Sequence, residues 1–147
     1  MNGDEVRTAR SEPDPAASEA SNTLESVRVL LVDDHSMFRR GVAAFLKQEG
    51  LMVVGEAANG EDGLRAAARL SPDVVVMDIH MPGMTGIEAT RKLLERSPEV
   101  QVLVFTISGD DDDVLRAIAA GACCYLLKDS RWTSWRRGSA RPPRVAR

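Results

Sequence analysis

The sequence predicts an α/β fold built on a doubly wound, five-stranded parallel sheet. Short aliphatic runs, which suit strands covered on both faces, alternate with segments whose apolar residues recur at helical spacing. Gly and Pro separate the two kinds of segment, and these residues mark turns and stop helices. Because five strands alternate with four helices, we expect right-handed crossovers with helices on both faces of the sheet.

The first predicted strand is the run V-R-V-L-L-V at residues 27–32, which ends at Asp33-Asp34. The first helix follows, because apolar residues recur at Phe38, Val42, Phe45 and Leu46, and Gly50 stops it. The other strands are expected at Met52–Val54, Val74–Met77, Val102–Phe105 and Cys124–Leu127. The other helices are expected around Glu61–Leu70, Gly86–Arg96 and Asp111–Ala120. A fifth helix would normally follow the last strand, and we expect it to be missing or replaced.

Length and composition restrict the class of protein. A chain of 147 residues with 44% hydrophobic and 28% charged residues predicts one soluble globular domain with tails. No apolar run approaches the ~20 residues that span a bilayer, and the N-terminus lacks the apolar core of a secretory signal. We therefore expect a cytoplasmic protein without membrane contact. The two cysteines are adjacent, which disfavours a structural disulfide between them.

Charge divides the chain into three parts. Residues 1–26 carry 6 acidic and 2 basic groups with few large apolar residues, which predicts a disordered acidic leader. Residues 27–130 form the predicted domain. Residues 131–147 carry 6 Arg, no acidic residue and both tryptophans, which predicts an unstructured or frameshifted basic tail.

Polar residues stand where four of the predicted strands end. They are Asp33 and Asp34 after the first strand, Asp78 after the third, Thr106 after the fourth and Lys128 after the fifth. Ligands of open parallel sheets bind beyond the carboxyl ends of the strands. Three carboxylates in reach of each other favour a hard divalent cation such as Mg²⁺. A lysine and a hydroxyl beside that ion are suited to a phosphoryl group, so the pattern predicts a Mg²⁺-assisted phosphoryl site.

Four motifs in this order resemble a known family. V-D-D-H, V-V-M-D-I-H-M-P-G-M-T-G, V-F-T and Y-L-L-K-D are similar to the receiver domain of bacterial two-component response regulators, and in particular to the LuxR-type (NarL/FixJ) subgroup. The resemblance covers about residues 27–130. It implies the flavodoxin-like receiver fold, truncated here after the fifth strand.

The resemblance also implies a phosphorylation chemistry. Asp78 would accept a phosphoryl group from a sensor histidine kinase, and Asp33 and Asp34 would hold Mg²⁺ together with Asp78. The main-chain carbonyl of His80 would supply a further metal ligand. Such a domain is a switch and not an enzyme, apart from its own phosphorylation and dephosphorylation.

Three further residues would respond to the phosphoryl group in that family. Thr106 would hydrogen-bond to it, Lys128 would pair with it, and Tyr125 would rotate inward. An aromatic residue in a final strand is also common as plain core, so both interpretations of Tyr125 stay open. The family further implies homodimers, and it implies DNA binding only if the intact gene encodes a C-terminal helix-turn-helix.

Other interpretations of these residues are weaker. A haloacid-dehalogenase-type phosphohydrolase also uses a strand-end Asp, but it needs a second Asp two residues on, where this chain has His80. The side chains of His35 and His80 receive no role. Asp110 to Asp113 cannot all face one point, which favours a capped, solvated helix start over a cation site. The Arg-rich tail could bind nucleic acid by charge alone.

The tail departs from the family pattern. Reverse translation of residues 131–147 with G+C-rich codons, read two nucleotides later, gives L-D-E-L-A-A-G-I-R-A-A-A-A-G-G-A, which has the pattern of an amphipathic helix. We therefore interpret the tail as a frameshifted stretch of a longer transcription regulator. The alternative is a stand-alone phosphate-accepting receiver without DNA-binding output.

Overall fold

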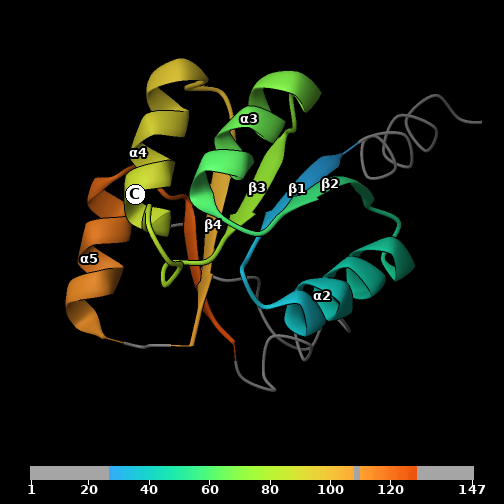
Figure 1. Cartoon of the computed structure of the whole chain (residues 1–147), viewed down its shortest axis with the longest axis horizontal. Helices are drawn as coiled ribbons and strands as arrows, with labels where there is room; N and C mark the ends of the chain where they lie inside the picture. The colour runs from blue at the N-terminus through green and yellow to red at the C-terminus, as the bar shows by residue number, and fades with distance from the viewer. Residues whose placement is uncertain (1–26, 108–109, 129–147) are drawn as a thin grey trace, which may run out of the picture.

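The structure is a computed structural model that describes residues 27–107 and 110–128 (Figure 1). The predicted leader, the predicted tail and the helix expected after the last strand all lie outside the described residues. In the described ranges, no helix is both long enough and apolar enough to cross a membrane.

Strands and helices alternate throughout, which confirms the predicted α/β class. The elements are β1 (Arg28–Val32), α2 (Ser36–Gln48), β2 (Met52–Ala57), α3 (Gly60–Leu70), β3 (Val74–Met77), α4 (Gly86–Arg96), β4 (Gln101–Thr106), α5 (Asp111–Ala119) and β5 (Cys124–Leu127). β3, α4 and β5 have the predicted bounds. β2 extends three residues beyond its prediction, because β1 pairs with it as far as Ala57 and continues the ladder through Gly55 and Glu56.

The five strands form one parallel sheet in the order β2-β1-β3-β4-β5. All carboxyl ends therefore lie at the same edge. The chain first adds β2 on one side of β1 and then adds β3 on the other, so the strand order reverses at β1. In sheets of this kind the reversal opens a crevice at the carboxyl edge, beside the ends of β1 and β3.

Helices cover both faces of the sheet, and β1 supplies residues to both cores. Leu30 and Val32 pack with the apolar residues of α3, α4 and α5, whereas Val29 and Leu31 pack with those of α2. Figure 1 shows α3 and α4 together on one side of the sheet and α2 on the other. Burial on both faces fixes β1 rigidly, and β1 in turn positions the residues that follow it.

Candidate functional site

Three carboxylates converge at the carboxyl edge of the sheet. Asp33 and Asp34 directly follow β1, and Asp78 directly follows the neighbouring strand β3. One oxygen from each, with a ring nitrogen of His35, forms a group of ligand atoms that all lie within 4.8 Å of one another. Asp33 and Asp78 are buried, and Asp34 is partly exposed. The sequence predicted this convergence, because neighbouring parallel strands end side by side.

Lys128 reaches the same cluster from the end of β5. Its Nζ lies 2.6 Å from Asp33 Oδ2 and 3.3 Å from Asp78 Oδ2, and its side chain is only 4% exposed. The ammonium also lies 4.4 Å from the centre of the Phe38 ring, which itself packs against Phe105. The two carboxylates and the Phe38 ring together hold the charged end of the long Lys128 side chain in one direction.

The cluster retains unused hydrogen-bonding capacity. Asp34 Oδ1, Asp78 Oδ2 and Lys128 Nζ are buried and find no hydrogen-bond partner within the described residues. Their contacts are ion pairs, from Lys128 to Asp33 and Asp78 and from His35 to Asp34. Buried polar atoms without partners are costly unless a ligand completes them. This donor set of carboxylate oxygens fits a hard divalent cation such as Mg²⁺.

Asp78 differs from an ordinary surface carboxylate in its acidity. Burial raises its pKa from 3.8 to about 6, Lys128 opposes the rise, and the charges of Asp33 and Asp34 add to it. The carboxylate is therefore still mainly ionised at pH 7 and above. Because much of its hydration is lost, its charge depends on neighbouring cationic groups.

The segment after Asp78 is shaped around that residue. The N–H of Gly86 donates to the carbonyl of Ile79, and a Cβ on Gly86 would lie 1.9 Å from the carbonyl oxygen of Asp78. Only glycine fits this close approach. The hydroxyl oxygen of Thr85 caps α4 by accepting a hydrogen bond from the backbone N–H of Glu88. The motif M-P-G-M-T-G thus brings the start of α4 against the backbone of Asp78.

Thr106 and Tyr125 lie on the neighbouring strands. Thr106 ends β4 and is completely buried. Its backbone carbonyl accepts a hydrogen bond from the backbone N–H of Lys128 at 2.7 Å. Tyr125 lies in β5 and packs against the core on the α5 side. Burial raises its pKa, with further contributions from Asp113 and Asp110. Thr106 is therefore at the edge of the site, while Tyr125 stands beside α5.

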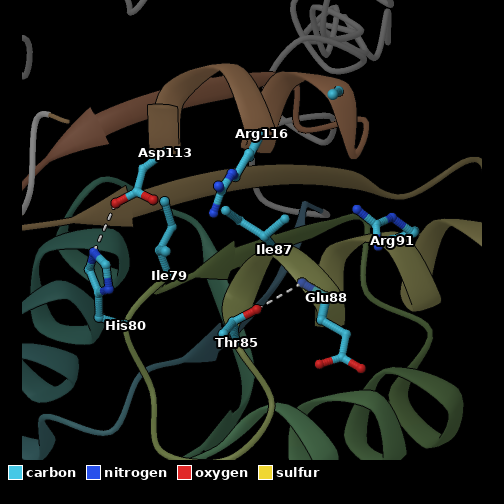
Figure 2. Close-up of a pocket in the computed structure, with 9 residues that line it drawn as sticks. Ile79, His80, Thr85, Ile87, Glu88, Arg91, Asp113 and Arg116 are labelled. Atoms are coloured by element: carbon cyan, nitrogen blue, oxygen red, sulfur yellow. Dashed lines mark hydrogen bonds and ion pairs between the residues drawn. The ribbon is translucent and has the colours of Figure 1, made fainter. Parts of the chain in front are cut away.

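Sequence reasoning gave no role to the two histidine side chains, and the structure places them differently. His35 Nδ1 lies 3.3, 3.1 and 3.8 Å from oxygens of Asp33, Asp34 and Asp78. His80 points toward Asp113 at the start of α5, and its Nε2 lies 3.1 Å from that carboxylate (Figure 2). The adjacency of His35 to Asp33-Asp34 was the one sequence signal for its position.

Asp33 and Asp78 line a small recess beside α2, and Asp34 lines a separate one. A pocket of about 620 Å³ lies between α4 and α5, with Ile79 and Ile87 in its wall and Arg91 and Arg116 at its rim (Figure 2). It flanks the acidic cluster without including it. Asp78 has a raised pKa and lies beside the buried Lys128. A perturbed carboxylate with a charged partner indicates a functional site more directly than the volume of a pocket does.

Comparison with known proteins identifies the family. Residues 29–134 match the response regulator receiver domain family. The transcriptional regulatory protein LiaR of Bacillus subtilis is 50% identical over 106 residues, which are 71% of this chain and 50% of LiaR. The nitrate/nitrite response regulator protein NarL of Escherichia coli is 44% identical over 106 residues, 71% of this chain and 49% of NarL. The chain thus spans about half the length of the curated relatives it matches.

Solved structures agree with the sequence comparison. A two-component response regulator of the LuxR family from an Aurantimonas strain has a TM-score of 0.68 and 38% identity, over 70% of this chain and 74% of that one. The receiver domain of the putative response regulator NarL from Mycobacterium tuberculosis has a TM-score of 0.68 and 37% identity, over 71% of this chain and 85% of that one. The predicted family is confirmed: the chain belongs to the response regulator receiver domain family of two-component systems, and it is a receiver domain and not a catalytic enzyme.

Proposed function

We propose that this receiver domain accepts a phosphoryl group on Asp78 from a sensor histidine kinase, with Mg²⁺ held by Asp33, Asp34 and Asp78. The observation that carries the proposal is the convergence of the three carboxylates with Lys128, at distances of 2.6 and 3.3 Å, around buried atoms that form no hydrogen bond. The main-chain carbonyl of His80, two residues beyond Asp78, is the further metal ligand in this proposal.

Asp78 acts as the nucleophile. Its carboxylate oxygen attacks the phosphorus of the donor's phosphohistidine, the N–P bond breaks, and the electron pair of that bond remains on the departing imidazole. Because the reacting carboxylate must be ionised, the raised pKa of Asp78 opposes the transfer at acidic pH, and bound Mg²⁺ would lower that pKa. Mg²⁺, when bound, supplies positive charge that offsets the repulsion between carboxylates and phosphoryl oxygens.

Lys128 and Thr106 hold the product. The ammonium of Lys128 already lies beside Asp78, so it can pair with a phosphoryl oxygen after a small movement. The hydroxyl of Thr106 donates to another phosphoryl oxygen. Phosphorylation adds negative charge and strong acceptors, and these draw the ends of β4 and β5 toward Asp78. Tyr125, which lies on β5 beside α5, rotates inward and carries the change to the surface.

The output in this proposal is control of transcription by a longer regulator. Its support comes from two relatives, a transcriptional regulatory protein and a nitrate/nitrite response regulator, of which this chain spans about half. DNA contact would come from a C-terminal helix-turn-helix if the intact gene encodes one. The active form is a cytoplasmic homodimer in this proposal.

The phosphorylation step is tested with acetyl phosphate, a small phosphoryl donor that replaces the kinase. The purified chain is incubated with acetyl phosphate and Mg²⁺, and its intact mass is measured. We expect a single phosphoryl addition that Asp78→Asn abolishes, because the amide cannot act as the nucleophile. Asp111→Asn is the matched control, because Asp111 is an exposed acid in the first turn of α5.

Two results would contradict the assignment. Undiminished labelling of Asp78→Asn would place the acceptor elsewhere, and equal loss in Asp111→Asn would make the effect one of total charge. Omission of Mg²⁺ with a chelator present should also abolish labelling of the unsubstituted chain. Circular dichroism of each variant verifies that the fold is retained.

A further inference from the structure

Cys123 and Cys124 form a pair of thiols at the end of the molecule opposite Asp78. Cys124 begins β5, whereas Lys128 directly follows its other end. Successive residues of a strand point to opposite faces, yet the two Sγ atoms lie only 3.5 Å apart. Cys123 precedes the strand, and its N–H donates to the carbonyl of Val102 at 2.8 Å. This anchored bend turns its side chain toward that of Cys124.

The pair is poorly arranged for a mutual disulfide. Adjacent Cα atoms across a trans peptide are about 3.8 Å apart, below the roughly 4.4–6.8 Å found in disulfides. Both cysteines are free, and both are partly exposed. In the free protein the Cys123 thiol donates a hydrogen bond to Cys124 Sγ at 3.5 Å, and this separation also matches the span of two sulfurs bound to one larger atom.

The distance between the two sulfurs indicates the coordination geometry of the bridging atom. With atom–sulfur bonds of about 2.3 Å, two sulfurs 3.5 Å apart subtend an angle of roughly 100°. A linear two-coordinate ion would need its sulfurs about 4.6 Å apart at the same bond length. Zinc would need two further protein ligands, but the one candidate group of three or more ligand residues in the described part of the chain is the carboxylate cluster with His35. A pyramidal trivalent centre needs only the two thiols and one non-protein ligand.

We propose that Cys123 and Cys124 bind trivalent arsenicals, the thiophilic class with this pyramidal geometry. For a monoorganoarsenical oxide the exchange is balanced without an oxidant. Two As–S bonds form, two S–H bonds and the As=O bond break, and the two protons leave with the oxygen as water. Burial, together with the smaller effect of the neighbouring Cys123 thiol, raises the pKa of Cys124 to about 12. The Cys124 thiol therefore stays protonated, which slows thiolate reactions and does not prevent the loss of water.

The fold presets the two thiols, so binding should depend on the folded state. Their separation is fixed by the anchor of Cys123 on Val102 and by the pairing of Cys124 with Leu103 of β4. A ligand that meets two preorganised groups gains affinity, because less freedom is lost on binding. β5 is an edge strand of the sheet and carries Tyr125. An atom bound to the thiol of its first residue would restrict the motion of this strand.

The test uses phenylarsine oxide with the full reduced chain, which contains only these two cysteines. We expect one arsenical per chain by intact mass and the loss of both maleimide-reactive thiols. An excess of a small dithiol should reverse the loss, whereas an excess of a monothiol should not. Cys123→Ser and Cys124→Ser should each lose the monothiol-resistant adduct. Asp78→Asn should bind unchanged, which separates this result from the test of phosphorylation.

Each other outcome would overturn the proposal. Failure of the reduced chain to protect both thiols would show that the pair does not close on one atom. Retention of the resistant adduct in either serine variant would show that a single thiol suffices. The chain unfolded in urea should bind at least tenfold more weakly than the folded chain. Equal affinity would show that the fold does not preset the site.

Discussion

The molecule contains two acidic groups of similar composition and opposite character. Asp33, Asp34 and Asp78 come from two strands, and their oxygens meet beside a buried lysine. Asp110 to Asp113 are consecutive in sequence and begin α5, where Asp110 accepts from the N–H of Asp112 and Asp111 and Asp112 are exposed. Convergence and burial, not the number of acids, give the first group its chemistry. The second group, as the sequence predicted, caps a helix.

The sharpest way to separate the two groups is to compare their response to Mg²⁺. The double variant Asp33→Asn/Asp34→Asn should lose labelling by acetyl phosphate by on the order of 100-fold or more, because it removes two charged metal ligands. Saturating Mg²⁺ should stabilise the unsubstituted chain by about 2–3 kcal/mol through preferential binding to the folded state. The double variant should show no such gain in thermal denaturation.

Asp111→Asn/Asp112→Asn is the matched control for that comparison. It removes the same charge from the start of α5, where both side chains are exposed. It should keep both the labelling and the Mg²⁺ gain. If the two double variants lost the gain equally, Mg²⁺ would be acting on overall charge, and the distinction between the groups would fail.

The next effect concerns the cost of ionising Asp78. Its pKa is raised from 3.8 to about 6 by burial, so the folded state resists ionisation more than the unfolded state does. Below about pH 4 both states are protonated, and the cost is absent. The free-energy cost grows between about pH 4 and 6, because Asp78 ionises in the unfolded state there and not yet in the folded state. Above about pH 6 the cost is constant. Asp78→Asn should therefore stabilise the metal-free chain by about 2–3 kcal/mol at pH 7.5 and hardly at all at pH 4.

Urea denaturation with a chelator at the two pH values measures this difference. Asp112→Asn is the reference, because an exposed acid in a first helical turn contributes only a few tenths of a kcal/mol through the helix dipole. A destabilised Asp78→Asn at pH 7.5 would mean that Lys128 more than offsets the loss of hydration. The Asp78 charge would then be a net stabiliser of the fold.

Much of the first group followed from sequence, because parallel strands end at a common edge. Asp33, Asp34, Asp78 and Lys128 could be brought together from strand positions alone, and the structure does so. The contacts of His35 and His80 could not, because they depend on how loop side chains rotate after the backbone is fixed. The end of β2 was also missed, because pairing with β1 carries the strand through Gly55-Glu56. The lesson is that topology positions groups, while local packing orients them.

A smaller effect is expected at the cap of α5. Asp110 accepts from the N–H of Asp112, so Asp110→Ala leaves a helix N-terminus without its side-chain partner. The expected loss is about 1 kcal/mol, with labelling at Asp78 unchanged. Asp110→Asn should recover most of the loss, because an amide oxygen also accepts at this position. A loss of labelling without a loss of stability would instead connect this residue to the phosphorylation chemistry.

The smallest effect tests a contact that links the neighbourhoods of the two groups. Asp113 lies 3.1 Å from Nε2 of His80, and the His80 side chain is 56% exposed. A double-mutant cycle of His80→Ala and Asp113→Ala should give a coupling below about 1 kcal/mol that falls with added salt, because water screens this pair. A larger, salt-independent coupling would show that Asp113 is energetically part of the loop after Asp78. Asp113 would then belong with the acidic group at the strand ends, and only Asp110 to Asp112 would form the separate group at the start of α5.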